Sequence, residues 1–197
     1  MNKFTALIVG ITGQDGSYLA KLLLSKGYKV FGSTRDSSIC DTSNLSKLNI
    51  LEYVDIISLA PNDFRSVIKA INSINPDEVY YLAGLTSVGL SFEQPVECME
   101  SISLGTLNFL EAIKLNQKKI KFFNAGSSEC FGNTNKIIAN EKTVFSPRSP
   151  YATAKATAFW IVSNYRESYN LFCCTGILGN HESPLRNKRF VTKKIVS

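Results

Sequence analysis

Tyr151 and Lys155 are the two residues whose types and spacing most directly suggest chemistry. A separation of four residues places the phenol and the ammonium on one face of a helix. A phenol, with a pKa of about 10, is a poor base at neutral pH, but neighbouring positive charges lower that pKa. Such a pair would move a proton to and from a hydroxyl group. Because the same spacing also occurs in ordinary surface helices, its meaning depends on what precedes it in the chain.

Ser127 and Glu129 follow a predicted strand at 120–125, ahead of the Tyr-Lys pair. Polar groups at the carboxyl end of a strand lie where open α/β folds bind their ligands. Ser127 is suited to hydrogen-bonding a substrate hydroxyl or carbonyl, and Glu129 to acting as a second acid or base. The alternative is that Ser127 caps a turn and Glu129 is a surface carboxylate.

A glycine-rich turn follows the first predicted strand, with the sequence Gly10-Ile11-Thr12-Gly13-Gln14-Asp15-Gly16. Glycines let the backbone approach a pyrophosphate, and the helix that follows offers free N–H groups to it. The position between strand and helix favours dinucleotide binding over packing alone. We therefore expect residues 10 and 12–16 to bind a cofactor, together with Leu82 and Ala83 at the end of a later strand and with Tyr151 and Lys155.

The second predicted strand ends in Thr34 and Arg35, where an NAD enzyme would present a carboxylate to the ribose hydroxyls. A guanidinium there favours the 2′-phosphate of NADP. The opposing interpretation is that Arg35 is a solvated loop charge, and the adjacent Asp36 weakens the electrostatic argument.

Short apolar runs alternate with longer amphipathic segments along the chain. The runs predict strands buried on both faces, at 6–10, 30–34, 54–59, 79–83, 120–125 and 173–178. The amphipathic segments predict helices at 17–26, 63–74, 99–115 and 150–169, and residues 191–197 resemble the opening of another. The polar stretch 37–49 is interpreted as a surface loop. This alternation predicts a doubly wound parallel sheet, the Rossmann fold.

Composition narrows the class of protein further. The net charge of +6 is modest and the acidic and basic residues are interspersed, so a polyanionic small molecule is as good a partner as nucleic acid. The basic residues form no stripe interleaved with aromatic residues, which argues against nucleic-acid binding. The five cysteines show no paired spacing, which argues against a disulfide framework and a metal site and favours the reducing cytoplasm. No apolar run is long enough to span a bilayer, so no membrane association is expected.

Together, the glycine turn, the Ser127–Glu129 segment and the Tyr151-x-x-x-Lys155 pair resemble the extended short-chain dehydrogenases/reductases, in their nucleotide-sugar-modifying branch. Longer runs are similar to the GDP-mannose 4,6-dehydratase family, and the resemblance covers nearly the whole chain. These runs are residues 10–19, 149–152, 164–169, 176–178, 180–184 and 190–192, with Lys194.

That resemblance implies an internal redox cycle on GDP-mannose with NADP as the cofactor. Tyr151, assisted by Lys155 and Ser127, would take the O4 proton as hydride leaves C4. Glu129 would then remove the C5 proton, water would leave C6, and the hydride would return to C6, giving GDP-4-keto-6-deoxymannose. Because net oxidation is zero, the enzyme would be a lyase. The resemblance also implies a homo-oligomer, a dimer or tetramer, and substrate contacts from Ser91, Phe92, Asn180, Arg186, Val191 and Lys194.

By the same resemblance, residues 1–180 form an NADP-binding Rossmann domain with the catalytic residues, and residues 181–197 begin a substrate-binding domain. Family members continue for well over a hundred further residues. We therefore expect a truncated chain that binds NADP but turns over GDP-mannose poorly. Two alternatives stay open: an NADPH-dependent reductase or epimerase of a nucleotide-linked keto sugar, and a non-catalytic cofactor-binding regulator.

Overall fold

A computed structural model describes residues 4–135, 137–187 and 190–196. Within these residues six strands form one parallel sheet in the order β3-β2-β1-β4-β5-β6. This is the doubly wound Rossmann order, in which the direction of winding reverses between β1 and β4. The fold class predicted from the sequence is therefore confirmed. The strands are β1 (Thr5–Val9), β2 (Lys29–Thr34), β3 (Val54–Ser58), β4 (Glu78–Tyr81), β5 (Lys121–Ala125) and β6 (Cys173–Gly176).

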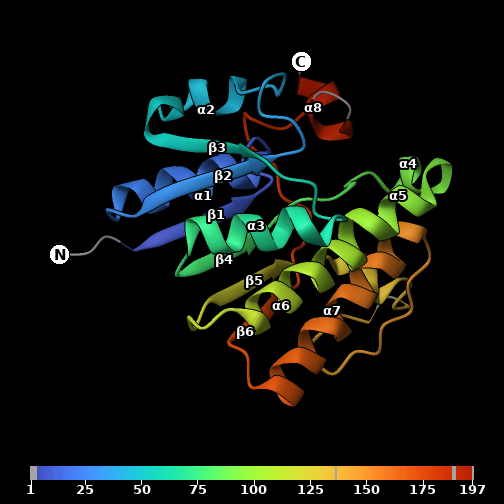
Figure 1. Cartoon of the computed structure of the whole chain (residues 1–197). Helices are drawn as coiled ribbons and strands as arrows, with labels where there is room; N and C mark the ends of the chain where they lie inside the picture. The colour runs from blue at the N-terminus through green and yellow to red at the C-terminus, as the bar shows by residue number, and fades with distance from the viewer. Residues whose placement is uncertain (1–3, 136, 188–189, 197) are drawn as a thin grey trace.

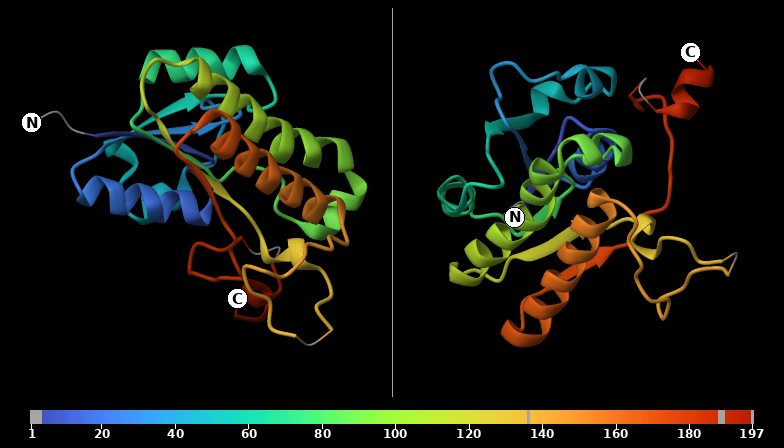
Figure 2. Two further views of the ribbon diagram at one scale, coloured as in Figure 1. Left: turned by 90° about the horizontal axis from the view of Figure 1, so that it is seen from below. Right: turned by 90° about the vertical axis from the view of Figure 1, so that its right-hand side faces the viewer.

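Helices cover both faces of the sheet. Figure 2 shows α3 (Phe64–Ile74), α6 (Gly105–Leu115) and α7 (Pro150–Tyr169) on one side and α1 (Gln14–Ser25) on the other. The shorter elements are α2 (Ser43–Lys47), the 3-10 turns η1 (Leu51–Tyr53) and η3 (Ser128–Phe131), α4 (Val88–Glu93), α5 (Pro95–Met99), the π-helical η2 (Glu100–Leu104) and α8 (Val191–Val196). No helix in the described part of the chain is long and apolar enough to cross a membrane.

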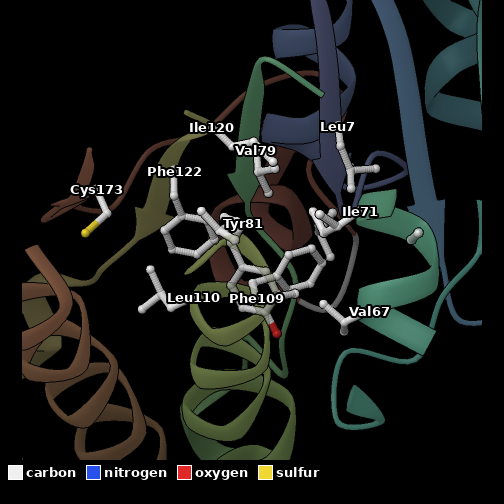
Figure 3. Close-up of a cluster of buried hydrophobic side chains, with 14 of the residues drawn as sticks. Leu7, Val67, Ile71, Val79, Tyr81, Phe109, Leu110, Ile120, Phe122 and Cys173 are labelled. Atoms are coloured by element: carbon white, nitrogen blue, oxygen red, sulfur yellow. The ribbon is translucent and has the colours of Figure 1, made fainter. Parts of the chain in front are cut away.

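Alternation of side chains along the strands builds two cores. In β1, Leu7 and Val9 face the α3–α6–α7 layer, and Ala6 and Ile8 face α1. The larger core is centred on Tyr81, with Phe109 and Phe122 among its neighbours (Figure 3). Because β1 is buried on both faces, its sequence is a continuous apolar run rather than an alternating one.

The long helix α7 carries the Tyr-Lys pair, and its ends are set by local sequence. The Ser149 hydroxyl caps the N-terminus by accepting from the Ala152 amide at 3.0 Å, and Pro150 occupies the first turn. Asn170, in the left-handed conformation, ends the helix. These signals fix where Tyr151 lies relative to the sheet, one residue inside the helix.

The sequence prediction differs from the structure in three places. The stretch 37–49 is not all loop, because α2 forms within it, anchored by the fully buried Leu45. The helix expected at 99–115 is a composite of α5, the π-helical η2 and α6, so it begins at Pro95. The short helix α4 was not predicted. The remaining elements lie within a few residues of their predicted ranges.

Candidate active site

A cavity of about 460 Å³ opens at the carboxyl edge of the sheet. Segments far apart in the sequence line it: the loops after β4, β5 and β6, the start of α7 and the residues around α8. The predicted catalytic residues Ser127, Glu129, Tyr151 and Lys155 all line this one cavity. The fold thus brings together the four side chains that the sequence singled out.

Lys155 is almost completely buried beneath the cavity. Its Nζ donates to the carbonyl oxygen of Ala125 at 2.6 Å and lies 5.8 Å from the centre of the Tyr151 ring. Burial lowers the pKa of Lys155 to about 8, because the apolar surroundings disfavour the charged ammonium. Near neutral pH this amine is therefore closer to its titration point than a surface lysine.

Tyr151 is also buried, and burial raises the pKa of its phenol, while a hydrogen bond with the Ser127 side chain acts in the opposite direction. We expect the Lys155 ammonium and the charge of a bound nicotinamide together to lower this pKa. In the protein without cofactor, desolvation outweighs the other contributions and the Lys155 Nζ is directed to the Ala125 carbonyl, so the combined effect stays a prediction. The phenol of the isolated protein is an acid and a hydrogen-bond donor rather than a ready base.

Ser127 and Glu129 lie on the turn that follows β5. The Ser127 hydroxyl caps η3 by accepting from the Glu129 amide at 3.3 Å. The turn-capping role considered as an alternative for Ser127 is therefore present in the structure. The same hydroxyl lines the cavity and interacts with Tyr151. Glu129 is exposed along the cavity wall, where its carboxylate is accessible to a ligand.

The glycine turn joins β1 to α1 with a geometry that two of its glycines require. Gly10 has φ +91°, and a Cβ on Gly16 would lie 2.4 Å from the Gly10 carbonyl oxygen. Gly13 differs, because a Cβ there would meet only the Gly10 oxygen, at an ordinary 3.4 Å. The absent side chain of Gly13 thus leaves open space outside the turn, and the N-terminal amides of α1 face that space.

Side chains of the turn are tied to the loop after β6. The His181 ring lies 2.7 Å from an Asp15 carboxylate oxygen through Nε2 and 2.8 Å from the Gly179 carbonyl through Nδ1. Gln14 accepts from the Ser183 hydroxyl at 2.7 Å. The hydrogen bond with the Gly179 carbonyl is the largest effect on the pKa of His181 and raises it; burial acts in the opposite direction, and Asp15 raises the pKa further. These contacts hold residues 179–183 against the first turn of α1, beside the predicted pyrophosphate site.

The other predicted cofactor contacts surround this turn. Leu82 lines the cavity, and the Ala83 backbone packs so closely against Gly10 that a Cβ there would lie 3.1 Å from the Ala83 Cα. The Thr12 carbonyl accepts from the Asn44 side chain at 3.0 Å. Arg35, largely exposed, forms an ion pair with Glu97 of α5 at 2.7 Å. These predicted cofactor residues therefore lie near the carboxyl edge of β1, β2 or β4, and the other two, Tyr151 and Lys155, lie on α7.

The predicted substrate residues divide into two groups. Asn180 and Arg186 line the cavity, and the Arg186 guanidinium stacks 3.7 Å from the centre of the Phe190 ring. The Nε atom of Arg186 is buried and lies 3.4 Å from a Glu182 carboxylate oxygen. This distance is close enough for charge attraction, but the two atoms lack hydrogen-bond geometry.

The second group lies elsewhere. Ser91 is fully buried and accepts from the Tyr151 amide at 3.2 Å, so it supports α7 rather than lining the cavity. Phe92 is exposed, and neither it nor Lys194 belongs to the described lining. The backbone of Val191 begins α8, but its side chain lies outside what the structure describes.

Sequence reasoning did not identify the His181–Asp15 contact or the partner of Arg35. Asp15 and His181 stand 166 positions apart, and nothing in their local sequence signals a contact. Phe190 and Thr192 also line the cavity and were not singled out individually. The strand order gives no signal for such pairs either, because β4 and β5 separate β6 from β1.

Comparison with known proteins shows which proteins the chain resembles. Residues 7–197 match the family model described as GDP-mannose 4,6 dehydratase. The chain is 45% identical over 201 residues to a GDP-mannose 4,6-dehydratase from Yersinia enterocolitica, which covers 96% of this chain and 53% of that protein. It is 47% identical over 199 residues to GDP-mannose 4,6 dehydratase 2 of Caenorhabditis elegans, with 96% and 52% covered. The chain therefore spans about half the length of the curated relatives it matches.

A solved structure shows the same fold. The dTDP-glucose 4,6-dehydratase of Streptomyces venezuelae, determined with NAD bound, superposes with a TM-score of 0.86 at 18% identity, covering 98% of this chain and 61% of that one. At this identity the likeness concerns the fold alone.

Proposed function

Because the chain belongs to the GDP-mannose 4,6-dehydratase family, we propose that it supplies the cofactor-binding and catalytic half of a nucleotide-sugar dehydratase. The substrate would be GDP-mannose and the product GDP-4-keto-6-deoxymannose. The observation that carries the proposal is the convergence of Ser127, Glu129, Tyr151 and Lys155 on one cavity beside the glycine turn. We further propose residues 1–180 as the Rossmann domain and 181–197 as the start of a substrate domain.

The glycine turn fits a dinucleotide. A Cβ on Gly16 would collide with the turn itself, whereas the space outside Gly13 is open to a pyrophosphate at the N-terminus of α1. Residues of this turn, with Leu82 and Ala83, would hold the cofactor. When bound, a nicotinamide cofactor accepts a hydride and returns it.

Tyr151 would take the proton of the sugar O4 hydroxyl as that carbon is oxidised. Its pKa is raised in the protein alone, so ionisation needs positive charge above the phenol in addition to the Ser127 hydrogen bond. Lys155 is suited to assist, since its buried amine titrates at about 8 and lies beside the Tyr151 ring. Ser127 would hold the O4 oxygen in position through a hydrogen bond.

Glu129 would remove the proton at C5, which the neighbouring ketone acidifies, so that water leaves from C6. Its exposure along the cavity wall suits a residue that must reach across a bound hexose. Asn180 and Arg186 line the same cavity and would contact the sugar nucleotide, with the guanidinium suited to its diphosphate. We keep Phe92, Val191 and Lys194 as proposed substrate contacts of the longer protein, whereas the fully buried Ser91 would position Tyr151 through the hydrogen bond from the Tyr151 amide.

For the cofactor we propose NADP, on the strength of Arg35 at the end of β2. We also propose a homo-oligomer and, from the cysteine pattern, a cytoplasmic location. The relatives at about 45% identity are named as dehydratases, which favours this activity over a reductase or epimerase.

The experiment follows a 4-keto product from GDP-mannose with a catalytic amount of NADP⁺, using this chain and a version extended by the C-terminal length of its relatives. We expect rapid turnover by the extended version and poor turnover by the 197-residue chain. In the extended version, Tyr151→Phe and Glu129→Gln should each reduce kcat by at least about 100-fold, whereas the exposed Glu93→Gln should not. A requirement for stoichiometric NADPH would contradict the proposal, because a dehydratase regenerates its own cofactor.

A further inference from the structure

Arg35, just beyond the end of β2, is held by an acid from a distant helix. Its Nη2 lies 2.7 Å from Oε1 of Glu97, in the middle of α5. The nearer acid, Asp36, is directed into its own loop, where its carboxylate accepts from the amide and hydroxyl of Ser38 at 2.9 Å and 2.6 Å. Glu97, rather than Asp36, is therefore the carboxylate that contacts the Arg35 guanidinium.

A second contact joins the same two regions. The Asn62 side chain, in the loop after β3, donates to Oε2 of Glu100 at 3.3 Å. Glu97 and Glu100 are three residues apart along continuous helical backbone, so they project from the same side of it. Both contacts therefore connect the α5–η2 segment with the loops at the carboxyl ends of β2 and β3.

These two loops flank the part of the sheet edge where a Rossmann fold receives the adenosine half of a dinucleotide. An anion bound at Arg35 would have to displace Glu97 or share the guanidinium with it. The pair is accessible, with side-chain exposures of 77% for Arg35 and 39% for Glu97. Exposed ion pairs are weak, so a dianionic phosphate can replace the carboxylate, but the competition lowers the net gain.

We propose that Glu97 is a specificity-determining residue that limits the preference of this chain for cofactors carrying a 2′-phosphate, by competing for Arg35. The inference rests on the proposed role of Arg35 in NADP binding. Removal of the Glu97 charge would free the guanidinium for the phosphate and leave the unphosphorylated ribose contacts unchanged. Glu97 itself does not touch reacting atoms.

The test measures binding by calorimetry, using the 197-residue chain and four probes: NADP⁺, NAD⁺, 2′,5′-ADP and 5′-AMP. Glu97→Gln should tighten the two 2′-phosphorylated probes about two- to fivefold, the range expected when an exposed ion pair no longer competes. NAD⁺ and 5′-AMP should bind as to the wild type. Glu93→Gln removes the same charge four residues earlier and should leave all four affinities unchanged. In Arg35→Gln, the added Glu97→Gln change should have no further effect.

The outcomes separate this inference from the cofactor assignment. Unchanged affinities in Glu97→Gln, or equal changes for NAD⁺ and NADP⁺, would overturn the role of Glu97 even if Arg35→Gln weakens NADP⁺ selectively. An unaltered NADP⁺ to NAD⁺ preference in Arg35→Gln would overturn both the role of Glu97 and the assignment of Arg35 to the phosphate.

Discussion

Two alanine substitutions in the glycine turn should have different consequences, one for the stability of the fold and the other for cofactor binding. In Gly16→Ala, the added methyl would lie 2.4 Å from the Gly10 oxygen and 2.7 Å from the Ile11 Cα, so the backbone must shift. Overpacking of this kind costs up to about 3 kcal/mol, and the gain in helix propensity offsets about 1 kcal/mol. We expect a net loss of about 2 kcal/mol, which lowers the melting temperature of a chain of this size by roughly 4–8 °C.

In Gly13→Ala the fold should survive while binding fails. Gly13 has φ −69° and ψ 168°, which any residue adopts, and a Cβ there makes only an ordinary contact. The lower conformational entropy of the unfolded chain stabilises the variant, and the weaker N-cap destabilises it. These two effects nearly cancel, leaving stability within about 1 kcal/mol. The methyl would nevertheless occupy the space through which a pyrophosphate reaches the α1 amides, and cofactor affinity should fall by more than about tenfold, or 1.4 kcal/mol.

Thermal unfolding and calorimetric titration with NADP⁺, applied to both variants, decide the matter. Wild-type affinity in a folded Gly13→Ala would show that the turn serves packing and not phosphate binding. An unchanged melting temperature in Gly16→Ala would show that the close approach of Gly16 to Gly10 is wrong.

Lys155→Met should stabilise the cofactor-free chain by on the order of 1–2 kcal/mol at pH 7, because it removes a buried charge. The pKa of Lys155 in the folded chain, about 8, lies below the ordinary 10.5, so wild-type stability rises with pH between these two values. The stability advantage of Lys155→Met should therefore vanish near pH 10.5, and urea unfolding at pH 7 and near pH 10.5 measures it. The pKa of His181 is raised, so its ring should lose its charge and release Asp15 as the pH increases through that folded-state pKa. Amide hydrogen exchange in residues 179–183 should then become faster. An exchange pattern that does not depend on pH, after correction for intrinsic rates, would contradict this. Gly105→Ala should cost more than about 2 kcal/mol, because its Cβ would collide with the Tyr81 hydroxyl, and Tyr81→Phe in the same chain should recover part of that loss; simple additivity in a double-mutant cycle would refute the clash.

Periodicity was sufficient for the sheet because the strands are buried on both faces. The continuous apolar run at β1 identified it within one residue, and the amphipathic pattern at 150–169 identified α7 in full. α2 was missed because its Ser- and Asn-rich sequence is typical of a loop, and it forms where Leu45 is fully buried. Tertiary burial thus overrode local propensity, which the sequence alone does not reveal.

The candidate site was predictable to the extent that strand ends position it. Ser127, Glu129, Tyr151 and Lys155 follow from motif spacing and the parallel topology. The raised pKa of Tyr151 in the protein without cofactor was not predictable, because desolvation depends on everything packed around the phenol. Ser91 was expected to contact substrate, yet its hydroxyl is directed to the Tyr151 amide, a detail of helix packing with no sequence signature.

The position of β1 within the sheet also has a consequence for synthesis on the ribosome. Ala6 pairs with Val30 on one side and with Glu78 on the other, so the second partner is translated much later than the first. The buried members of the smaller core all lie between Ala6 and Ile50, so they are translated before β4. At bacterial to eukaryotic elongation rates, β1 has one unpaired edge for about two to ten seconds. During that interval the nascent chain presents a flat apolar strand to its neighbours, and we expect chaperone dependence to concentrate there rather than in the later strands.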